Sequence, residues 1–201
     1  MMGSIKPAPT QRSGTVSRRY NTIVIGGGQT GLATAYHLKT AGIDYVVLDA
    51  SHRIGDAWRN RWDSLRLFTQ ARMNGLPGMA FPATGNDFVS KDQVADFLES
   101  YAETMELNVL STTRVERLSK SGDDFVFETD HGQFTAPSVI VAMADYQKPK
   151  IPEFASDLDP GIVQMHSSAY RNPGQLADGP VLVVGFGNSG ADIAIDVAPT
   201  H

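Results

Sequence analysis

The stretch IVIGGGQTGLATAYHL, residues 23–38, decides the fold. It opens with branched apolar residues typical of a buried strand and continues with apolar residues at helical spacing. Between the two lies the pattern Gly26-x-Gly28-x-x-Gly31. A glycine turn between a strand and a helix is typical of a dinucleotide-binding βαβ unit, in which the helix N-terminus holds a pyrophosphate.

The residues around this turn extend the same prediction. Gly26 permits a tight turn, Gly28 lets backbone N–H groups approach a phosphate, and Gly31 lets the helix pack closely on the strand. We expect the helix to run from Gln29 to about residue 41 and a second strand to cover residues 45–49. Asp49 would end that strand, where its carboxylate can accept hydrogen bonds from an adenosine ribose.

A second copy of the pattern lies near the end of the chain. Residues 182–197, LVVGFGNSGADIAIDV, align glycine for glycine with residues 23–38 and repeat the turn at Gly185, Gly187 and Gly190. Residues 180–185 predict another strand. Two copies of one nucleotide-binding unit are more informative than either alone.

The segment between the copies predicts one helix and a small antiparallel sheet. Ser90 and Gln93 form a capping box for a helix over residues 91–105. Residues 114–143 alternate or run apolar between turn signals, which predicts a β-meander that leads into a buried strand ending near Met143.

Composition excludes several classes of function. A net charge of -5 and a pI near 5.5 argue against nucleic-acid binding. The absence of cysteine removes disulfides, thiolate metal sites and iron–sulfur clusters, so redox chemistry would need a bound organic cofactor. No apolar run has membrane-spanning length and no signal-peptide core is evident. We expect a cytoplasmic protein with no metal site and no membrane or nucleic-acid partner.

Residues 55–69, GDAWRNRWDSLRLFT, combine both tryptophans with three arginines. Flat apolar rings beside guanidinium groups suit a planar, partly anionic ligand such as a flavin. Buried aromatic anchors with solvated arginines would give the same pattern.

The run GGGQTG, the following Asp49 and the stretch GDAWRNRWDSLRLFTQARMNGLPGMAFP at 55–82 resemble the flavin-containing monooxygenase superfamily, in particular its bacterial branch related to the plant YUCCA-type enzymes. This resemblance implies that the first turn binds FAD and the second binds NADPH. The residues expected to contact FAD are Gly26, Gly27, Gly28, Gln29, Thr30, Gly31, Asp49, Ala50, Ala57, Trp58, Arg59, Phe68 and Thr69. Those expected to contact NADPH are Gly185, Gly187, Asn188, Ser189 and Gly190.

The sequence departs from the family pattern at several points. Phe68 and Gln70 stand where many members place an asparagine near the flavin ring, and Ala144 replaces a glycine, which would strain a backbone with positive φ. His166 lies in a stretch, HSSAY, similar to a His-Ser-x-x-Tyr element, although a lone loop histidine is usually structural. Thr69, Gln70 and His166 are the weak candidates for a catalytic role.

The resemblance also implies an organisation and a reaction. We expect an α/β protein with a flexible arm at 1–19, an incomplete Rossmann-like FAD-binding domain at 20–148, a linker at 149–179 and the first βα unit of an NAD(P)H-binding domain at 180–201. Family members continue well beyond this point, so we expect about half a protein, impaired or inactive alone, that self-associates through an exposed end.

The implied reaction is a monooxygenation. NADPH would reduce FAD, and reduced flavin with dioxygen would form a C4a-hydroperoxide that oxygenates a small organic substrate. Two alternatives stay open: a non-enzymatic remnant that binds FAD, and a single-Rossmann NAD(P)-dependent dehydrogenase. The dehydrogenase leaves the second glycine turn and Trp58 without a purpose.

Overall fold

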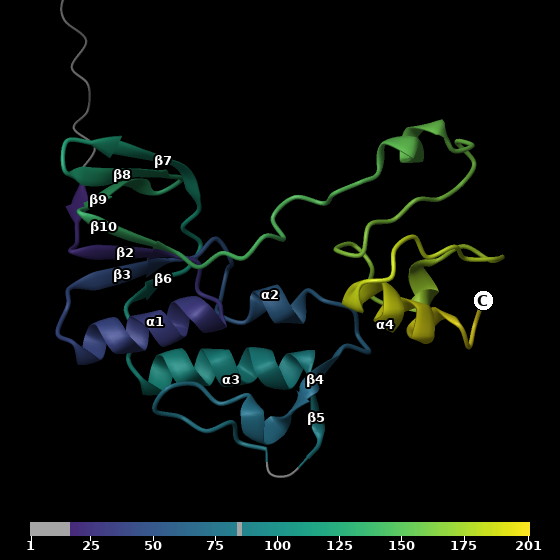
Figure 1. Cartoon of the computed structure of the whole chain (residues 1–201), viewed down its shortest axis with the longest axis horizontal. Helices are drawn as coiled ribbons and strands as arrows, with labels where there is room; N and C mark the ends of the chain where they lie inside the picture. The colour runs from purple at the N-terminus through teal and green to yellow at the C-terminus, as the bar shows by residue number, and fades with distance from the viewer. Residues whose placement is uncertain (1–16, 84–85) are drawn as a thin grey trace, which may run out of the picture.

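A four-stranded parallel sheet forms the core of the N-terminal part of the protein, at the left of Figure 1. The computed structural model describes residues 17–83 and 86–201. The strand order is β10-β2-β3-β6, with each neighbouring pair parallel. The strands are β2 (Thr22–Ile25), β3 (Tyr45–Leu48), β6 (Val109–Leu110) and β10 (Ser138–Val141).

The two central strands are buried on both faces, which explains their almost continuous apolar sequence. Successive residues point to opposite faces. Val24 and Val47 pack with Ala35 of helix α1 (Gln29–Thr40) on one face. Ile23 and Val46 belong to a cluster on the other face.

The second face is covered by the predicted meander. Strands β7 (Val115–Ser121), β8 (Asp124–Thr129) and β9 (Gly132–Ala136) form antiparallel pairs. Phe127 and Phe134 from this sheet are 0% and 1% exposed and pack against the β2 and β3 side chains. The predicted α/β fold with a parallel sheet and a β-meander is confirmed.

Helix α3 (Lys91–Thr104) begins at the predicted capping box, in which Gln93 N–H donates to Ser90 Oγ at 3.3 Å and Ser90 N–H donates to Gln93 Oε1 at 2.9 Å. Its apolar face shares a core cluster with residues of α1 and of the preceding loop. That loop contains helix α2 (Asp56–Arg59), the antiparallel strands β4 (Arg66–Gln70) and β5 (Phe88–Ser90), and the short helix η1 (Ala71–Met73).

The C-terminal part is mostly irregular and lies to one side of the sheet in Figure 1. It contains the short helices η2 (Glu153–Asp157) and η3 (Pro173–Gln175) and the helix α4 (Asn188–Val197). A core cluster joins this part to the loop after α2, and its buried members are Trp62, Leu65, Tyr170, Ile193 and Val197.

Several expectations need correction. The strand predicted at 180–185 is wrong, because these residues have no strand neighbour to bond in the described parts of the chain. Arg18 and Arg19, assigned to a loose arm, form β1, which pairs with β9; residues 1–16 of that arm lie outside the described residues. Strand β10 is not buried as expected, because it is an edge strand with Val141 62% exposed. Strand β6 was not predicted.

None of the helices in the described parts of the chain has the length and apolar character needed to cross a membrane. Within residues 17–83 and 86–201, no three His, Asp or Glu side chains gather where they could hold a metal ion.

Candidate functional site

The first glycine turn connects β2 to α1 and is held by backbone contacts. Gly26 has φ 105°, and its N–H donates to Leu48 O at 2.8 Å. A Cβ on Gly26 would lie 2.7 Å from Ala142 O, and one on Gly31 would lie 1.8 Å from Gly26 O. Both positions therefore require glycine for packing alone.

Gly28 differs from the other two glycines of the pattern. A Cβ built on it meets no atom within 4 Å. It is the N-cap of α1, with φ -77° and ψ -176°, a conformation open to any residue. Since the protein itself does not require glycine here, the open space beside Gly28 is the room that a ligand phosphate would need.

The N-terminus of α1 is also free of internal partners. No side chain caps it and no acidic residue occupies its first turn. The first amides of a helix have no intrahelical acceptor and carry partial positive charge. Gln29 and Thr30 are exposed at this end, so the helix presents N–H donors beside the open space at Gly28.

Asp49 lies directly beside this turn. Its Oδ2 accepts from Gly27 N–H at 2.5 Å, and its Oδ1 accepts from Ser51 N–H at 2.8 Å. Asp49 therefore lies at the end of β3 beside the turn, where the spacing predicted it. The spacing did not predict that both carboxylate oxygens bond to backbone amides, although an aspartate followed by a turn is typical of the Ser51 contact. Ala50 is exposed next to it.

The second turn repeats the geometry of the first. Gly185 has φ 98°, close to the 105° of Gly26, and Gly187 caps α4 with φ -82° and ψ -179°. A Cβ on Gly190 would lie 2.2 Å from Gly185 O, whereas one on Gly187 meets nothing within 4 Å. Helix α4 also lacks a side-chain cap and a first-turn acid, and Asn188 and Ser189 begin it.

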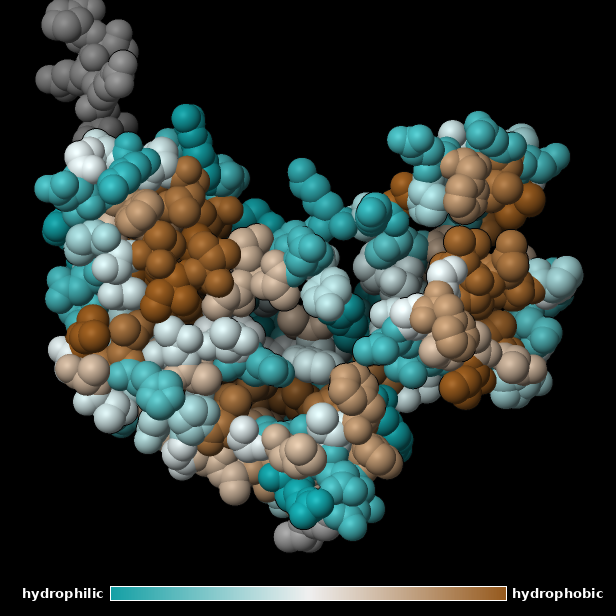
Figure 2. All heavy atoms as spheres, in the orientation of Figure 1, coloured by the Kyte–Doolittle hydropathy of each residue, from teal (hydrophilic) through white to brown (hydrophobic). Residues whose placement is uncertain are grey.

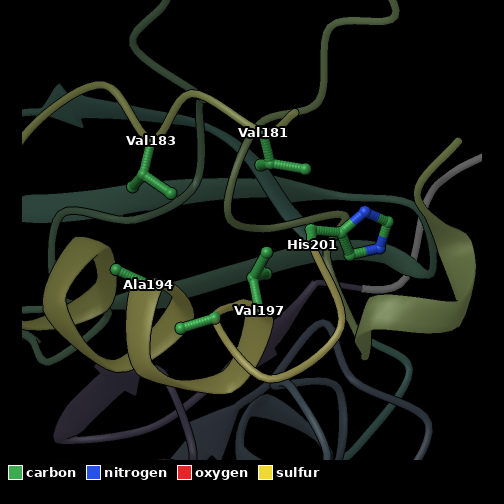
Figure 3. A pocket seen from close by; sticks show the side chains of 6 residues that line it. Val181, Val183, Ala194, Val197 and His201 are labelled. Carbon is green, nitrogen blue, oxygen red and sulfur yellow. The ribbon is translucent and has the colours of Figure 1, made fainter. Parts of the chain in front are cut away.

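The surroundings of the two turns are different. Leu182 is 86% exposed, whereas Ile23, at the same place in the first copy, is fully buried. An open pocket of about 350 Å³ lies between the segment 181–183 and α4, lined by Val181, Val183, Ala194, Val197, Ala198 and His201 (Figure 3). Figure 2 shows apolar residues gathered over this part of the protein. The second unit thus has a formed turn beside an uncovered apolar segment.

Trp58 connects two regions of the core. It is half-buried on α2 and packs against both the cluster that contains Leu32 of α1 and the cluster around Trp62. Leu32 directly follows Gly31 in α1 and is fully buried in the first of these clusters, so Trp58 packs on a core cluster that also includes the first turn of α1. Ala57 beside it is exposed.

Arg59 does not have the free guanidinium that the sequence argument expected. It donates to Glu99 Oε2 at 2.6 Å and to Asp96 Oδ1 at 2.9 Å, and its side chain is 14% exposed. Burial lowers the pKa of Arg59, but hydrogen bonds and attraction from these two carboxylates outweigh burial and raise it. The guanidinium of Arg59 is therefore held by carboxylates of α3.

The three candidates on β4 differ in their surroundings. Phe68 is 80% exposed. Thr69 Oγ1 donates to Asn74 Oδ1 at 2.5 Å, and Gln70 Oε1 accepts from Arg72 Nε at 3.0 Å. Asn74 was not singled out from the sequence, because its contact with Thr69 depends on the turn at η1.

His166 lies in the irregular C-terminal part, where its Nδ1 is 2.9 Å from Ser168 Oγ. This contact is local, and among the described residues the hydrogen bonds of the His166 side chain go to Ser168 rather than to either glycine turn or to β4. The buried member of the same stretch is Tyr170, whose OH donates to Asp196 Oδ2 at 2.7 Å. Burial and the Asp196 contact raise the pKa of Tyr170, which keeps this hydroxyl a donor.

The structure therefore brings the first turn and Asp49 together, places Trp58 on a core cluster that includes Leu32 of α1, and leaves the second turn as a separate site. The family model described as pyridine nucleotide-disulphide oxidoreductase matches residues 23–200. The chain belongs to this family. It has no cysteine, so the thiol pair of a disulphide reductase is absent from it.

The similar proteins include monooxygenases, which confirms the resemblance drawn from the sequence. An uncharacterized CzcO-like oxidoreductase of Geobacillus kaustophilus is 46% identical over 89% of this chain and 51% of its own length. Indole-3-pyruvate monooxygenase YUCCA1 of Oryza sativa is 31% identical over 96% of this chain and 48% of its own. A flavin-containing monooxygenase from Stenotrophomonas maltophilia superposes with a TM-score of 0.84 at 34% identity, covering 90% of this chain and 56% of its own.

The similarity extends over only part of each relative. The chain spans about half the length of the curated relatives it matches. Its family is one of oxidoreductases, and flavin monooxygenases are among the proteins that it is similar to.

Proposed function

We propose that this chain binds FAD at the first glycine turn and belongs to an NADPH-dependent flavin monooxygenase. The observation that supports this best is the contrast between Gly28 and its neighbours. Gly26 and Gly31 are required by internal packing, whereas Gly28 borders open space at an uncapped helix N-terminus. A pyrophosphate would fill that space and accept hydrogen bonds from the amides of α1.

The remaining residues fit an adenine dinucleotide. Asp49 stands at the carboxyl end of β3, next to the turn, where a ribose hydroxyl would reach it. Trp58 would bound the site on its apolar side. FAD, when bound, would supply the acceptor for hydride and the centre that activates dioxygen. The chain itself would bind and orient the cofactor and exclude water from it.

The second turn is the proposed NADPH site. Its dihedral angles and its open position at Gly187 match those of the first turn. Gly185, Gly187, Asn188, Ser189 and Gly190 would present backbone N–H groups to a phosphate. Because the apolar segment beside this turn is exposed, few side chains would contact the adenosine and nicotinamide groups of NADPH. Contacts to the phosphate groups alone would give NADPH poor affinity.

A titration with FAD tests the proposal. We expect the purified protein to bind FAD, Gly28→Ala to lose that binding, and Gly187→Ala to keep it, because the second variant alters the same position of the other turn. Both variants should fold, since neither Cβ meets an atom of the protein. Equal FAD affinity of Gly28→Ala and the parent protein would refute the assignment.

NADPH separates the alternative functions. We expect anaerobic NADPH to reduce bound flavin slowly or not at all, for lack of a walled nicotinamide site. Rapid, saturable bleaching at micromolar NADPH would contradict that expectation and show a complete reductive site. A colourless protein that binds NAD tightly would favour the single-Rossmann dehydrogenase.

A further inference from the structure

Helix α2 is too short to hold its own position. It has four residues, Asp56–Arg59, and no side-chain cap at Gly55. A single turn of helix pays the full entropy of nucleation and gains few hydrogen bonds. The position of Trp58, which lies on this helix, must therefore come from contacts with the rest of the protein.

Arg59 supplies the first set of contacts. Its Nη2 donates to Asp96 and Glu99 on α3, at 2.9 and 2.6 Å. Its Nη1 donates to Ile54 O at 2.7 Å, just before α2 begins. One guanidinium thus ties α3 to the chain entering α2, in the fork geometry that lysine cannot reproduce.

Lys91 holds the other end. It is the first residue of α3 and is only 7% exposed. Its Nζ donates to Arg59 O at 3.2 Å and to Asp92 Oδ1 at 2.9 Å. A buried ammonium is stable only with such partners, so the carbonyl that ends α2 is fixed to the start of α3.

The backbones of the two helices are in close contact between these ends. A Cβ on Gly55, which has φ 89°, would lie 2.5 Å from Ala95 O. No intervening side chain separates α2 from α3 at this point. Close packing against α3 therefore allows α2 one position, and the hydrogen bonds of Arg59 and Lys91 hold it there.

We propose that Arg59 and Lys91 are positioning residues, which hold Trp58 against the core cluster that also contains Leu32 of α1, so that the FAD site is preformed. This inference rests on the proposed function. Neither residue would touch the cofactor; both would act through Trp58, which packs against the cluster containing Leu32. The role differs from direct phosphate binding, which the engagement of Arg59 with two carboxylates opposes.

The test compares Arg59→Gln, Glu99→Gln and Lys91→Met with Arg53→Gln as the matched control. Arg53 is 57% exposed and its side chain bonds only Asp56, so its removal leaves α2 attached to α3. Hydrogen exchange of the 56–60 amides is measured without FAD, and FAD affinity is measured by titration. We expect faster exchange and roughly tenfold weaker FAD binding in the three variants, and neither change in the control.

Two further measurements separate positioning from general loss of stability. In a Trp58→Phe background, Arg59→Gln should weaken FAD binding much less than it does alone, because the residue through which it acts is already changed. Glu99→Gln keeps the shape of the partner and should leave the thermal unfolding midpoint close to that of the parent, so its loss of FAD affinity cannot be ascribed to unfolding.

The outcomes distinguish the two proposals. Faster exchange in α2 with unchanged FAD affinity would overturn the positioning role and leave FAD binding at the turn intact. Full additivity of Trp58→Phe and Arg59→Gln would overturn it as well. Absence of FAD binding in the unmodified protein would instead overturn the proposed function, and the positioning role with it.

Discussion

Asp49 Oδ2 accepts a hydrogen bond from the backbone N–H of Gly27 at 2.5 Å. This bond joins the carboxyl end of β3 to the glycine turn after β2. The partner oxygen, Oδ1, accepts from Ser51 N–H. One carboxylate therefore orders both segments that would meet the adenosine end of a dinucleotide.

Replacement of Asp49 by alanine should weaken FAD binding and loosen the turn. Two amides lose a charged acceptor, and the expected cost in FAD binding is about 2 kcal/mol, roughly 30-fold in dissociation constant. Titration of apoprotein with FAD measures it. Asp44→Asn is the control, because Asp44 is exposed just before β3, away from the turn. Equal affinities of Asp49→Ala and the parent protein would contradict this prediction.

Gly31→Ala should destabilise the protein, unlike Gly28→Ala. The new Cβ would start 1.8 Å from Gly26 O, so α1 must move away from β2 at an expected cost of about 2 kcal/mol or more. Gly28→Ala should cost under about 1 kcal/mol, the effect of alanine at an N-cap. Chemical denaturation of the two variants compares these costs, and similar midpoints would mean that the turn is less tightly packed than described.

Ala144→Gly should stabilise the protein. Ala144, which stands where the family pattern has a glycine, has φ 57°, in the left-handed region that favours glycine. A left-handed conformation costs a non-glycine residue about 1–2 kcal/mol, and the added freedom of glycine in the unfolded chain offsets part of the gain. We expect a net gain of about 0.5–1 kcal/mol in the free energy of unfolding. Ala142→Gly, outside the left-handed region, should be destabilising.

The uncovered segment at the second turn should promote self-association. Leu182 and Val184 are 86% and 62% exposed, and their backbone lies in no sheet of the described chain. Unpaired extended segments with apolar side chains are templates for association. Leu182→Lys should shift sedimentation equilibrium toward the monomer. Phe68→Lys, a change at an 80% exposed residue elsewhere, should have little effect; an equal shift would point to non-specific association.

Much of this arrangement was predictable because it is local in sequence. The glycine spacing, the capping box at Ser90 and the apolar runs of β2 and β3 each depend on residues within one element and its flanks. Asp49 was found because a βα unit has a nearly fixed length. The meander followed from alternation between turn signals.

The rest depends on contacts between distant residues. The ion pairs of Arg59 could not be predicted from the sequence, because its partners Asp96 and Glu99 lie on another helix. The apolar run at 181–184 satisfies every local rule for a strand, but a strand exists only if neighbours accept its hydrogen bonds. Strands as short as Val109–Leu110 and Arg18–Arg19 carry too little pattern to be detected.

The second glycine turn has the same dihedral angles as the first although no sheet holds the residues before it. Its shape is therefore encoded within about ten residues, a stretch short enough to close rapidly during folding. If residues 183–192 were transplanted between a strand and a helix of an unrelated scaffold, they should therefore form the same turn, with open space beside Gly187. The two glycine turns of this repeat could then replace one another. They would differ only in the strands and side chains that pack around them.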